Sequence, residues 1–225
     1  MAEKNKEEKK SFADTFSAVV TKYRVLLLGI IVGLIVIAIA AGISVSVTQS
    51  FHKKALTEVD AIVYKLTQAS ADSGDSVRAD SLAALQSLAE KNKRNVAGVR
   101  AYMVIAELYY NDSEWEAASE AWLAAARAGE KSYTAPLAYY NAAVCEEELG
   151  NLSDAVSYYE KALTGNDFYF TTHTLFSIGR IKESLNDFAG AAVQYEKLHD
   201  TYPSDLWTSL AESRLIELRA EGKIQ

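Results

Sequence analysis

The sequence contains a single cysteine, Cys145, among its 225 residues. One cysteine excludes an internal disulfide and any metal site built from several cysteines. Histidine is nearly as scarce, and no two histidines stand three or four residues apart, the spacing that would place two metal ligands on one helix face. We therefore expect no bound metal, and the fold has to be held together by the packing of side chains.

Recognisable catalytic motifs are also missing. The chain has no glycine-rich phosphate loop and no nucleophile elbow. No set of acid, base and nucleophile stands in a pattern that indicates a reaction. Cys145 lies mid-helix among small residues in "NAAVCEEE", where we expect a buried thiol rather than a reactive one. We expect the protein not to be an enzyme, and to have no cofactor and no small-molecule substrate.

Positive charge is sparse after residue 51. Residues 52–225 hold 17 basic and 26 acidic side chains, whereas residues 1–51 hold six basic and four acidic ones. An acidic domain repels phosphate backbones, so we expect no nucleic-acid partner. The acidic run Glu146–Glu148 ends a predicted helix, and we expect it to be a solvated face.

Charge is absent altogether from Val25 to Val47, "VLLLGIIVGLIVIAIAAGISVSV". A helix needs about 20 apolar residues to cross a bilayer, and this run is longer and has no polar face. We interpret it as a transmembrane helix. A cleaved signal peptide is the alternative, because Ala38-Ile39-Ala40 has the form of a cleavage site, but the apolar run continues past it.

Lysine and arginine counts beside this helix predict its orientation. Residues 1–24 form a basic tail with six such residues, namely Lys4, Lys6, Lys9, Lys10, Lys22 and Arg24. The twenty residues after Val47 hold three. We expect the N-terminus in the cytoplasm and the large domain outside it. Within the helix, Gly29 and Gly33 have the four-residue spacing that permits close helix–helix packing in lipid.

Proline is limited to Pro136 and Pro203, and no stretch has the alternation of a strand. Instead the chain repeats one phrase. Three alanines mark it at steps of 37 and 36 residues, and an aromatic residue follows each by four: Ala118 and Trp122, Ala155 and Tyr159, Ala191 and Tyr195. Spacings of three and four residues lie on one helix face, so each phrase is an amphipathic helix.

A second predicted helix precedes each phrase and carries a small residue at a fixed place: Ala106, Ala143 and Gly179. A side chain this small lets the partner helix approach closely, and the aromatic residue of the phrase packs into the gap. Each repeat is therefore a helical hairpin, and hairpins of this kind must stack to bury their apolar faces.

These hairpins resemble the tetratricopeptide repeat (TPR), best in "YMVIAELYYNDSEWEAASEAW" from residue 102. Glu146 and Lys182 depart from the tyrosine usual at their place. The expected fold is all-α: one transmembrane helix and a TPR-like α-solenoid of about four hairpins with a capping helix. The expected segments are the tail 1–24, the membrane helix 25–47 and the domain 48–225, divided into a degenerate hairpin 52–92, repeats 99–131, 136–167 and 172–203, and the cap 204–220.

The resemblance implies that the first helices of the repeats line a concave groove that binds protein or peptide segments. Carrying over the groove positions gives Arg100, Met103, Glu107 and Tyr110, then Leu137, Tyr140, Val144 and Glu147, then His173, Phe176, Arg180 and Glu183. We call these twelve residues the groove set. Its apolar column Met103, Tyr140 and Phe176 suits an adaptable binding surface, unless the chain's own ends cover it. The Lys and Asn with which the family clamps acidic C-terminal tails are absent.

The layout as a whole resembles the ancillary subunit of the bacterial Sec translocon, which is anchored at its N-terminus in the inner membrane. That resemblance implies an accessory role with the translocon, periplasmic chaperones and envelope proteins. An envelope scaffold for cell division or outer-membrane assembly is one alternative. A cytosol-facing import receptor is another, and it requires the opposite orientation.

Overall fold

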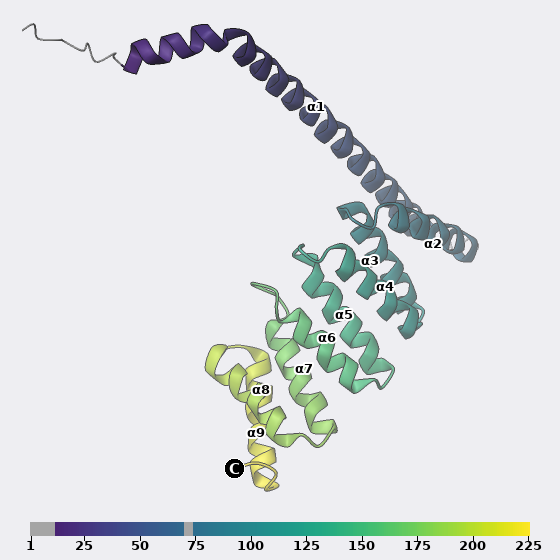
Figure 1. Ribbon diagram of the computed structural model, residues 1–225. Helices are drawn as coiled ribbons and strands as arrows, with labels where there is room; N and C mark the ends of the chain where they lie inside the picture. Colours follow the sequence, from purple (N-terminus) through teal and green to yellow (C-terminus); the bar gives the residue numbers. More distant parts are fainter. Residues whose placement is uncertain (1–11, 70–73) are drawn as a thin grey trace, which may run out of the picture. The chain divides into compact units, whose positions relative to one another are not determined.

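The computed structural model describes residues 12–69 and 74–225, and in them it contains nine α-helices and no strand (Figure 1). The expected all-α fold is thereby confirmed. The helices are α1 (Phe12–Gln68), α2 (Gly74–Lys91), α3 (Val96–Asn111), α4 (Trp115–Ala128), α5 (Thr134–Glu148), α6 (Leu152–Ala162), α7 (Thr171–Ser184), α8 (Phe188–Thr201) and α9 (Leu206–Ala220). Lys4, Lys6, Lys9 and Lys10 of the predicted tail lie outside the described residues.

The chain divides into two compact units, residues 1–51 and 52–225, and the boundary falls inside α1. Helix α1 is long and apolar enough to cross a membrane. It continues past the end of the apolar run at Val47 and through the segment expected to start a separate hairpin. The reason is local, because residues 48–68 contain neither glycine nor proline to interrupt the helix. An added methyl group at Gly29 or Gly33 would meet nothing within 4 Å, so this face of α1 is open.

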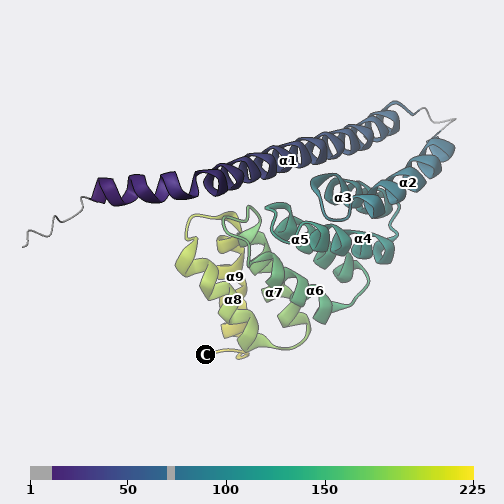
Figure 2. The ribbon, with the colours of Figure 1, turned by 45° about the horizontal axis from the view of Figure 1, so that its top comes forward.

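Within residues 52–225, each helix from α2 to α9 packs on the next one along the chain (Figures 1 and 2). The pairs α3/α4, α5/α6 and α7/α8 are the three expected hairpins. Helix α2 lies on α3, and α9 lies on α8 and α7. The last turns of α1 belong to the same core, since Val59 is fully buried in a cluster with Leu85 and Ala89 of α2.

The turn inside each hairpin has the same backbone geometry. One residue adopts a positive φ angle in each turn, 61° at Ser113, 77° at Gly150 and 61° at Asn186. The N–H of the next residue then donates to a carbonyl five residues back, at 2.9 Å from Glu114 and 2.8 Å from Asn151. This arrangement satisfies the last carbonyls of the first helix and reverses the chain in few residues. The sequence repeat is therefore also a repeat of the backbone.

The small residue of each hairpin faces the aromatic ring as expected. The fit is tightest in the third hairpin, where a methyl group built on Gly179 would lie 2.3 Å from Cε1 of the Tyr195 ring. Tyr159 and Tyr195 are fully buried, and Trp122 is nearly so. The three marker alanines, Ala118, Ala155 and Ala191, are also fully buried.

Replacing Gly179 by alanine should destabilise the domain. The added methyl overlaps the Tyr195 ring, and overpacking of this kind costs about 1–3 kcal/mol of unfolding free energy. Thermal unfolding of the full chain followed by circular dichroism measures the loss. Gly42→Ala is the control, because the same methyl there meets nothing within 4 Å. Equal melting of Gly179→Ala and Gly42→Ala would contradict the close approach.

Candidate protein-interaction groove

The groove set lies on the first helix of each hairpin, α3, α5 and α7. None of its twelve side chains is fully buried. Arg100, Glu107, Tyr110 and Arg180 are exposed, and the others are half-buried. The set is thus on an accessible face, and the neighbours of each member decide what that member is free to bind.

Tyr140, in the second repeat of the groove set, lies at the centre of a cluster of aromatic side chains. The Tyr140 ring stacks on Phe170 with centroids 5.0 Å apart, and its hydroxyl shares a 2.7 Å hydrogen bond with Nδ1 of His173. The His173 ring contacts Trp207 edge-on at 4.3 Å, and Phe176 lies 5.3 Å from the same indole. We call Tyr140, Phe168, Phe170, His173, Phe176 and Trp207 the aromatic cluster. Burial raises the pKa of Tyr140 to about 12 and lowers that of His173.

A cavity of about 530 Å³ opens beside this cluster. Its walls come from α5, from the first turn of α7 and the segment before it, and from the start of α9: Tyr140, Tyr169, Phe170, Thr172, His173, Asp205, Leu206 and Trp207. The cavity is walled mostly by rings, with Thr172 and Asp205 as polar positions. Such a pocket suits an apolar or aromatic side chain with one polar neighbour.

The chain's own end covers part of the apolar column. Trp207, in the helix expected only to cap the solenoid, packs on both His173 and Phe176. Phe176 also packs on Tyr195 in the core of the third hairpin. Tyr140 keeps a face on the cavity, and Met103 lines a separate cavity. The column is therefore open at the first two repeats and partly filled at the third.

Three members of the cluster were not identified from the sequence. Phe168 and Phe170 lie between α6 and α7, and Trp207 lies in the first turn of α9. The segment "NDFYF" held a signal, since aromatic residues are unusual in a polar connection. Trp207 gave none, because a single aromatic residue in an amphipathic helix is normally a core residue.

The charged members of the groove set on α5 and α7 are held by ion pairs and by hydrogen bonds from buried tyrosines. Glu147 accepts a 2.7 Å hydrogen bond from the Tyr159 hydroxyl and forms an ion pair with Arg180. One repeat later, Glu183 accepts a 2.6 Å bond from the Tyr195 hydroxyl and an ion pair from Arg214. Each bridge joins the two helices of one hairpin to the first helix that follows that hairpin. These carboxylates are therefore structural, and they are not free to bind a partner.

The first repeat has no such bridge. Tyr110 and Trp122 stand where the other repeats have glutamate and tyrosine. Among the described residues, the indole N–H of Trp122 has no hydrogen-bond partner. Tyr110 packs edge-on against Trp115 at 4.9 Å instead. The joint after the first repeat thus lacks the bridge of the later joints, and a buried hydrogen bond from Ser119 to Glu146 lies there instead.

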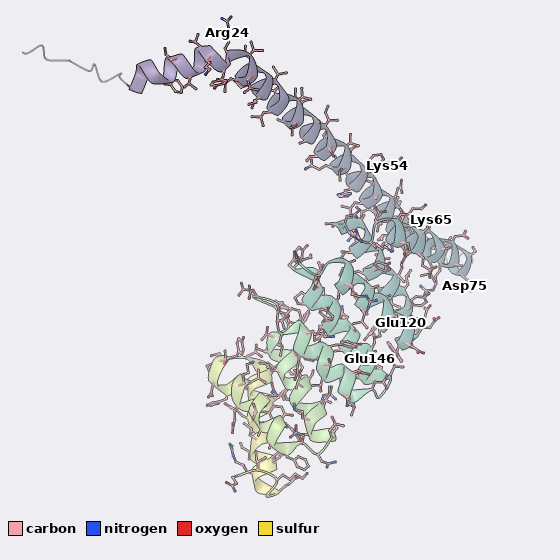
Figure 3. The ribbon with its side chains drawn as sticks, in the orientation of Figure 1. Arg24, Lys54, Lys65, Asp75, Glu120 and Glu146 are labelled. Carbon is pink, nitrogen blue, oxygen red and sulfur yellow. The ribbon has the colours of Figure 1, made fainter. Side chains whose placement is uncertain are left out.

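The acidic run at the end of α5 is not a solvated face, contrary to expectation. Glu146, labelled in Figure 3, is buried and accepts hydrogen bonds from Ser119 at 2.5 Å and Asn151 at 2.9 Å. Glu147 is in the bridge described above, and only Glu148 is exposed. A glutamate at the usual tyrosine place is thus accommodated by polar partners on both flanking helices.

The part of the chain that the structure describes contains neither a group of side chains that could hold a metal ion nor an ionised thiol. In residues 12–69 and 74–225, no three His, Cys, Asp or Glu side chains are grouped so as to hold a metal ion. Burial raises the pKa of the Cys145 thiol to about 12, so it is protonated at neutral pH.

Two comparisons with known proteins bear on this groove. Residues 104–207 match a family model described as a "Domain of unknown function (DUF6340)", and this segment includes every groove-set residue except Arg100 and Met103. The chain is also similar to a "TPR repeat-containing protein" of Treponema pallidum (strain Nichols), with 33% identity over 153 residues, or 66% of this chain. The chain covers 64% of that relative's length. The relative's printed name agrees with the repeated hairpins, and neither description refers to protein secretion.

The Glu183 bridge makes stability depend on pH. Burial by itself would raise the pKa of Glu183, but the hydrogen bonds from Arg214 and Tyr195 outweigh it, and the pKa lies below the ordinary value of 4.5. A lowered carboxyl pKa contributes stability that is complete above the unfolded-state pKa and is lost as the pH falls through the folded-state value. We expect Glu183→Gln to reduce the unfolding free energy by about 1–3 kcal/mol at pH 7.

Denaturant unfolding of both proteins at pH 7 and at pH 3 measures this dependence. The difference between them should shrink as the pH falls below about 4.5. Glu212→Gln is the control, since that carboxylate is exposed and paired only with His199. A difference that stays constant with pH would show that Glu183 acts through packing alone.

Proposed function

We propose that the protein is a non-enzymatic, membrane-anchored scaffold that holds a segment of a partner protein in its groove. The observation that carries this proposal is the cavity of about 530 Å³ beside Tyr140, His173 and Trp207. Aromatic pockets on an accessible face are where interface energy concentrates.

The partner segment is apolar or aromatic rather than acidic. The positions where related arrays place Lys and Asn carry Met103 and Glu107, then Tyr140 and Val144. Arg180 is already neutralised by Glu147. The groove therefore has little free positive charge along α5 and α7 to attract a carboxylate tail, whereas its rings suit a large apolar side chain.

Anchorage raises the local concentration of the groove beside a membrane complex. Helix α1 would span the bilayer with the N-terminus in the cytoplasm, following the excess of basic residues in the first 24 positions. The helical domain would then be extracytoplasmic, on the inner membrane of a bacterium. Gly29 and Gly33 would form the packing seam with another membrane helix. A tethered groove binds its partner at a concentration set by the tether rather than by diffusion through the compartment.

The finer assignment is an accessory factor of the Sec translocon and the periplasmic chaperone network, supported by the layout of tail, single anchor and degenerate first hairpin. An envelope scaffold for cell division or outer-membrane assembly is the second candidate, and it uses the same groove with different partners.

In-cell photocrosslinking tests both candidates. A crosslinking amino acid at Thr172 or Leu206, on the wall of the cavity, should capture a discrete set of proteins, which mass spectrometry identifies. Tyr140→Ala should lower the yield about tenfold, since truncating a central aromatic contact costs on the order of 1–2 kcal/mol. Tyr64→Ala, which removes an exposed tyrosine from α1, is the matched control. A probe at Ser157, exposed on α6, controls for random capture.

The identities of the captured proteins decide between the candidates. Translocon subunits, chaperones or nascent envelope proteins support the secretion role, and division or cell-wall proteins support the scaffold. Equal capture from Ser157 and Thr172, or a yield unaffected by Tyr140→Ala, would show that this groove is not the binding surface.

A further inference from the structure

One edge of the helical domain presents an exposed apolar residue at the start of every first helix. These residues are Val96, Tyr133, Tyr169 and Leu206, with exposed fractions of 71%, 92%, 88% and 70%. They precede or begin α3, α5, α7 and α9. Tyr133 and Tyr169 are almost fully exposed, although the Tyr169 ring contacts Phe170 edge-on, so burial in the core does not account for these positions. We call these four residues and the basic residues Lys93, Arg94 and Lys131 the loop edge.

The loop edge is continuous. Val96 and Tyr133 line one cavity of about 1080 Å³, Tyr133 and Tyr169 line a second of about 930 Å³, and Tyr169 and Leu206 line the cavity beside the aromatic cluster. Neighbouring cavities thus share a lining residue from one end of the edge to the other. Four separate exposed residues therefore form a single strip.

The first cavity of this strip is basic, although the domain as a whole is acidic. The first cavity is lined by five basic side chains, Lys93, Arg94, Arg100, Arg127 and Lys131, and by two acidic ones, Asp60 and Glu130. Arg100 is paired with Asp60 at 2.8 Å. Among the described residues, Arg94, Arg127 and Lys131 take part in no ion pair. The domain as a whole has 26 acidic and 17 basic residues, so this is a local basic patch on an acidic protein.

The opposite edge, where the turns inside the hairpins lie, has an acidic cavity rather than a basic one. Its cavity is lined by Glu114, Glu116 and Glu120 and by no basic residue. The two edges therefore differ in both charge and exposed aromatic content, which gives the domain a preferred face toward an anionic surface.

We propose that the loop edge binds the surface of a bilayer that contains anionic phospholipid. Tyrosine is favoured at the membrane–water interface, because its ring enters the headgroup layer while its hydroxyl stays hydrated. Lysine and arginine near an anionic leaflet each contribute about 1 kcal/mol of attraction. An acidic peptide held by the basic residues of the first cavity would leave Tyr169 uncovered, because Tyr169 does not line that cavity.

The covalent chain keeps the first cavity of this edge within reach of a bilayer. Leu56 lines the first cavity of the loop edge, and it follows Val47, the end of the apolar run, by only nine residues. Nine residues span about 14 Å as helix and about 30 Å when fully extended. The inference rests on the proposed anchorage of α1. Tyr169 and Leu206 also line the groove's cavity, whereas Tyr133 and the three basic residues of the loop edge do not.

The test uses the full chain reconstituted into phosphatidylcholine vesicles with and without phosphatidylglycerol. An environment-sensitive fluorophore is attached at Tyr133→Cys or Tyr169→Cys, in a Cys145→Ala background that leaves one thiol for labelling. Ser153→Cys is the control, because Ser153 is exposed in the first turn of α6, next to the hairpin turn of the opposite edge. We expect the signal at 133 and 169 to rise about twofold with phosphatidylglycerol, and to return in high salt to its level in phosphatidylcholine alone. The signal at 153 should not change.

A charge-reversed variant makes the test specific. Lys93→Glu, Arg94→Glu and Lys131→Glu together should abolish the response, and all three side chains are exposed, so folding is retained. Equal signals at 133, 169 and 153 in both vesicle types would overturn the proposal. So would a response to an added acidic peptide without a response to phosphatidylglycerol.

Two further measurements distinguish the loop-edge proposal from the proposals on the groove and on the membrane anchor. Tyr140→Ala, which alters the groove, should leave the lipid response unchanged. Flotation of the unlabelled chain with vesicles reports on the anchor itself, and a chain that does not float overturns both the anchorage and the loop-edge contact.

Discussion

A hairpin of two short helices cannot bury its own apolar face, and every feature of the helical domain depends on how that face is covered. Each hairpin places a ring of its second helix against a small residue of its first, most closely at Gly179 and Tyr195. This close approach brings the first helices near enough to share their remaining surfaces with the next hairpin. Stacking then creates one continuous core where isolated hairpins would have none.

The tyrosine rings that fill the gaps also determine the polar structure of the groove. Their hydroxyls emerge beside the first helices, where Glu147 and Glu183 accept hydrogen bonds from them and ion pairs from the following repeat. A buried carboxylate is costly unless it is paired and hydrogen-bonded. The bridges meet that requirement, and as a result the groove has few free charges and presents mainly rings.

The first repeat departs from this scheme, with Tyr110 and Trp122 in place of the glutamate and tyrosine. The Trp115 ring that packs on Tyr110 lines the acidic cavity of the opposite edge, whereas Arg100 and Met103, on the same helix as Tyr110, line the basic cavity of the loop edge. The domain therefore has two chemically distinct surfaces. An aromatic pocket lies toward the C-terminal repeats, and a strip of exposed apolar residues, basic at its first cavity, lies along the starts of the first helices. A protein segment suits the first surface, and an anionic interface suits the second.

The sequence by itself determined the helical class, the phase of the repeats, the rings and small residues of the core, and the apolar run of α1. The rings and small residues lie three, four or eight residues apart on one helix, so helical periodicity predicts them, while the recurring phrase sets the phase of the repeats and the absence of charge marks the apolar run. The tertiary structure alone decided which groove residues are free to bind a partner. Glu147 and Arg180 stand 33 residues apart, and Trp207 reaches His173 and Phe176 from another helix. Contacts of that separation depend on how far each hairpin is rotated on the next, and that rotation follows from packing that no local pattern records.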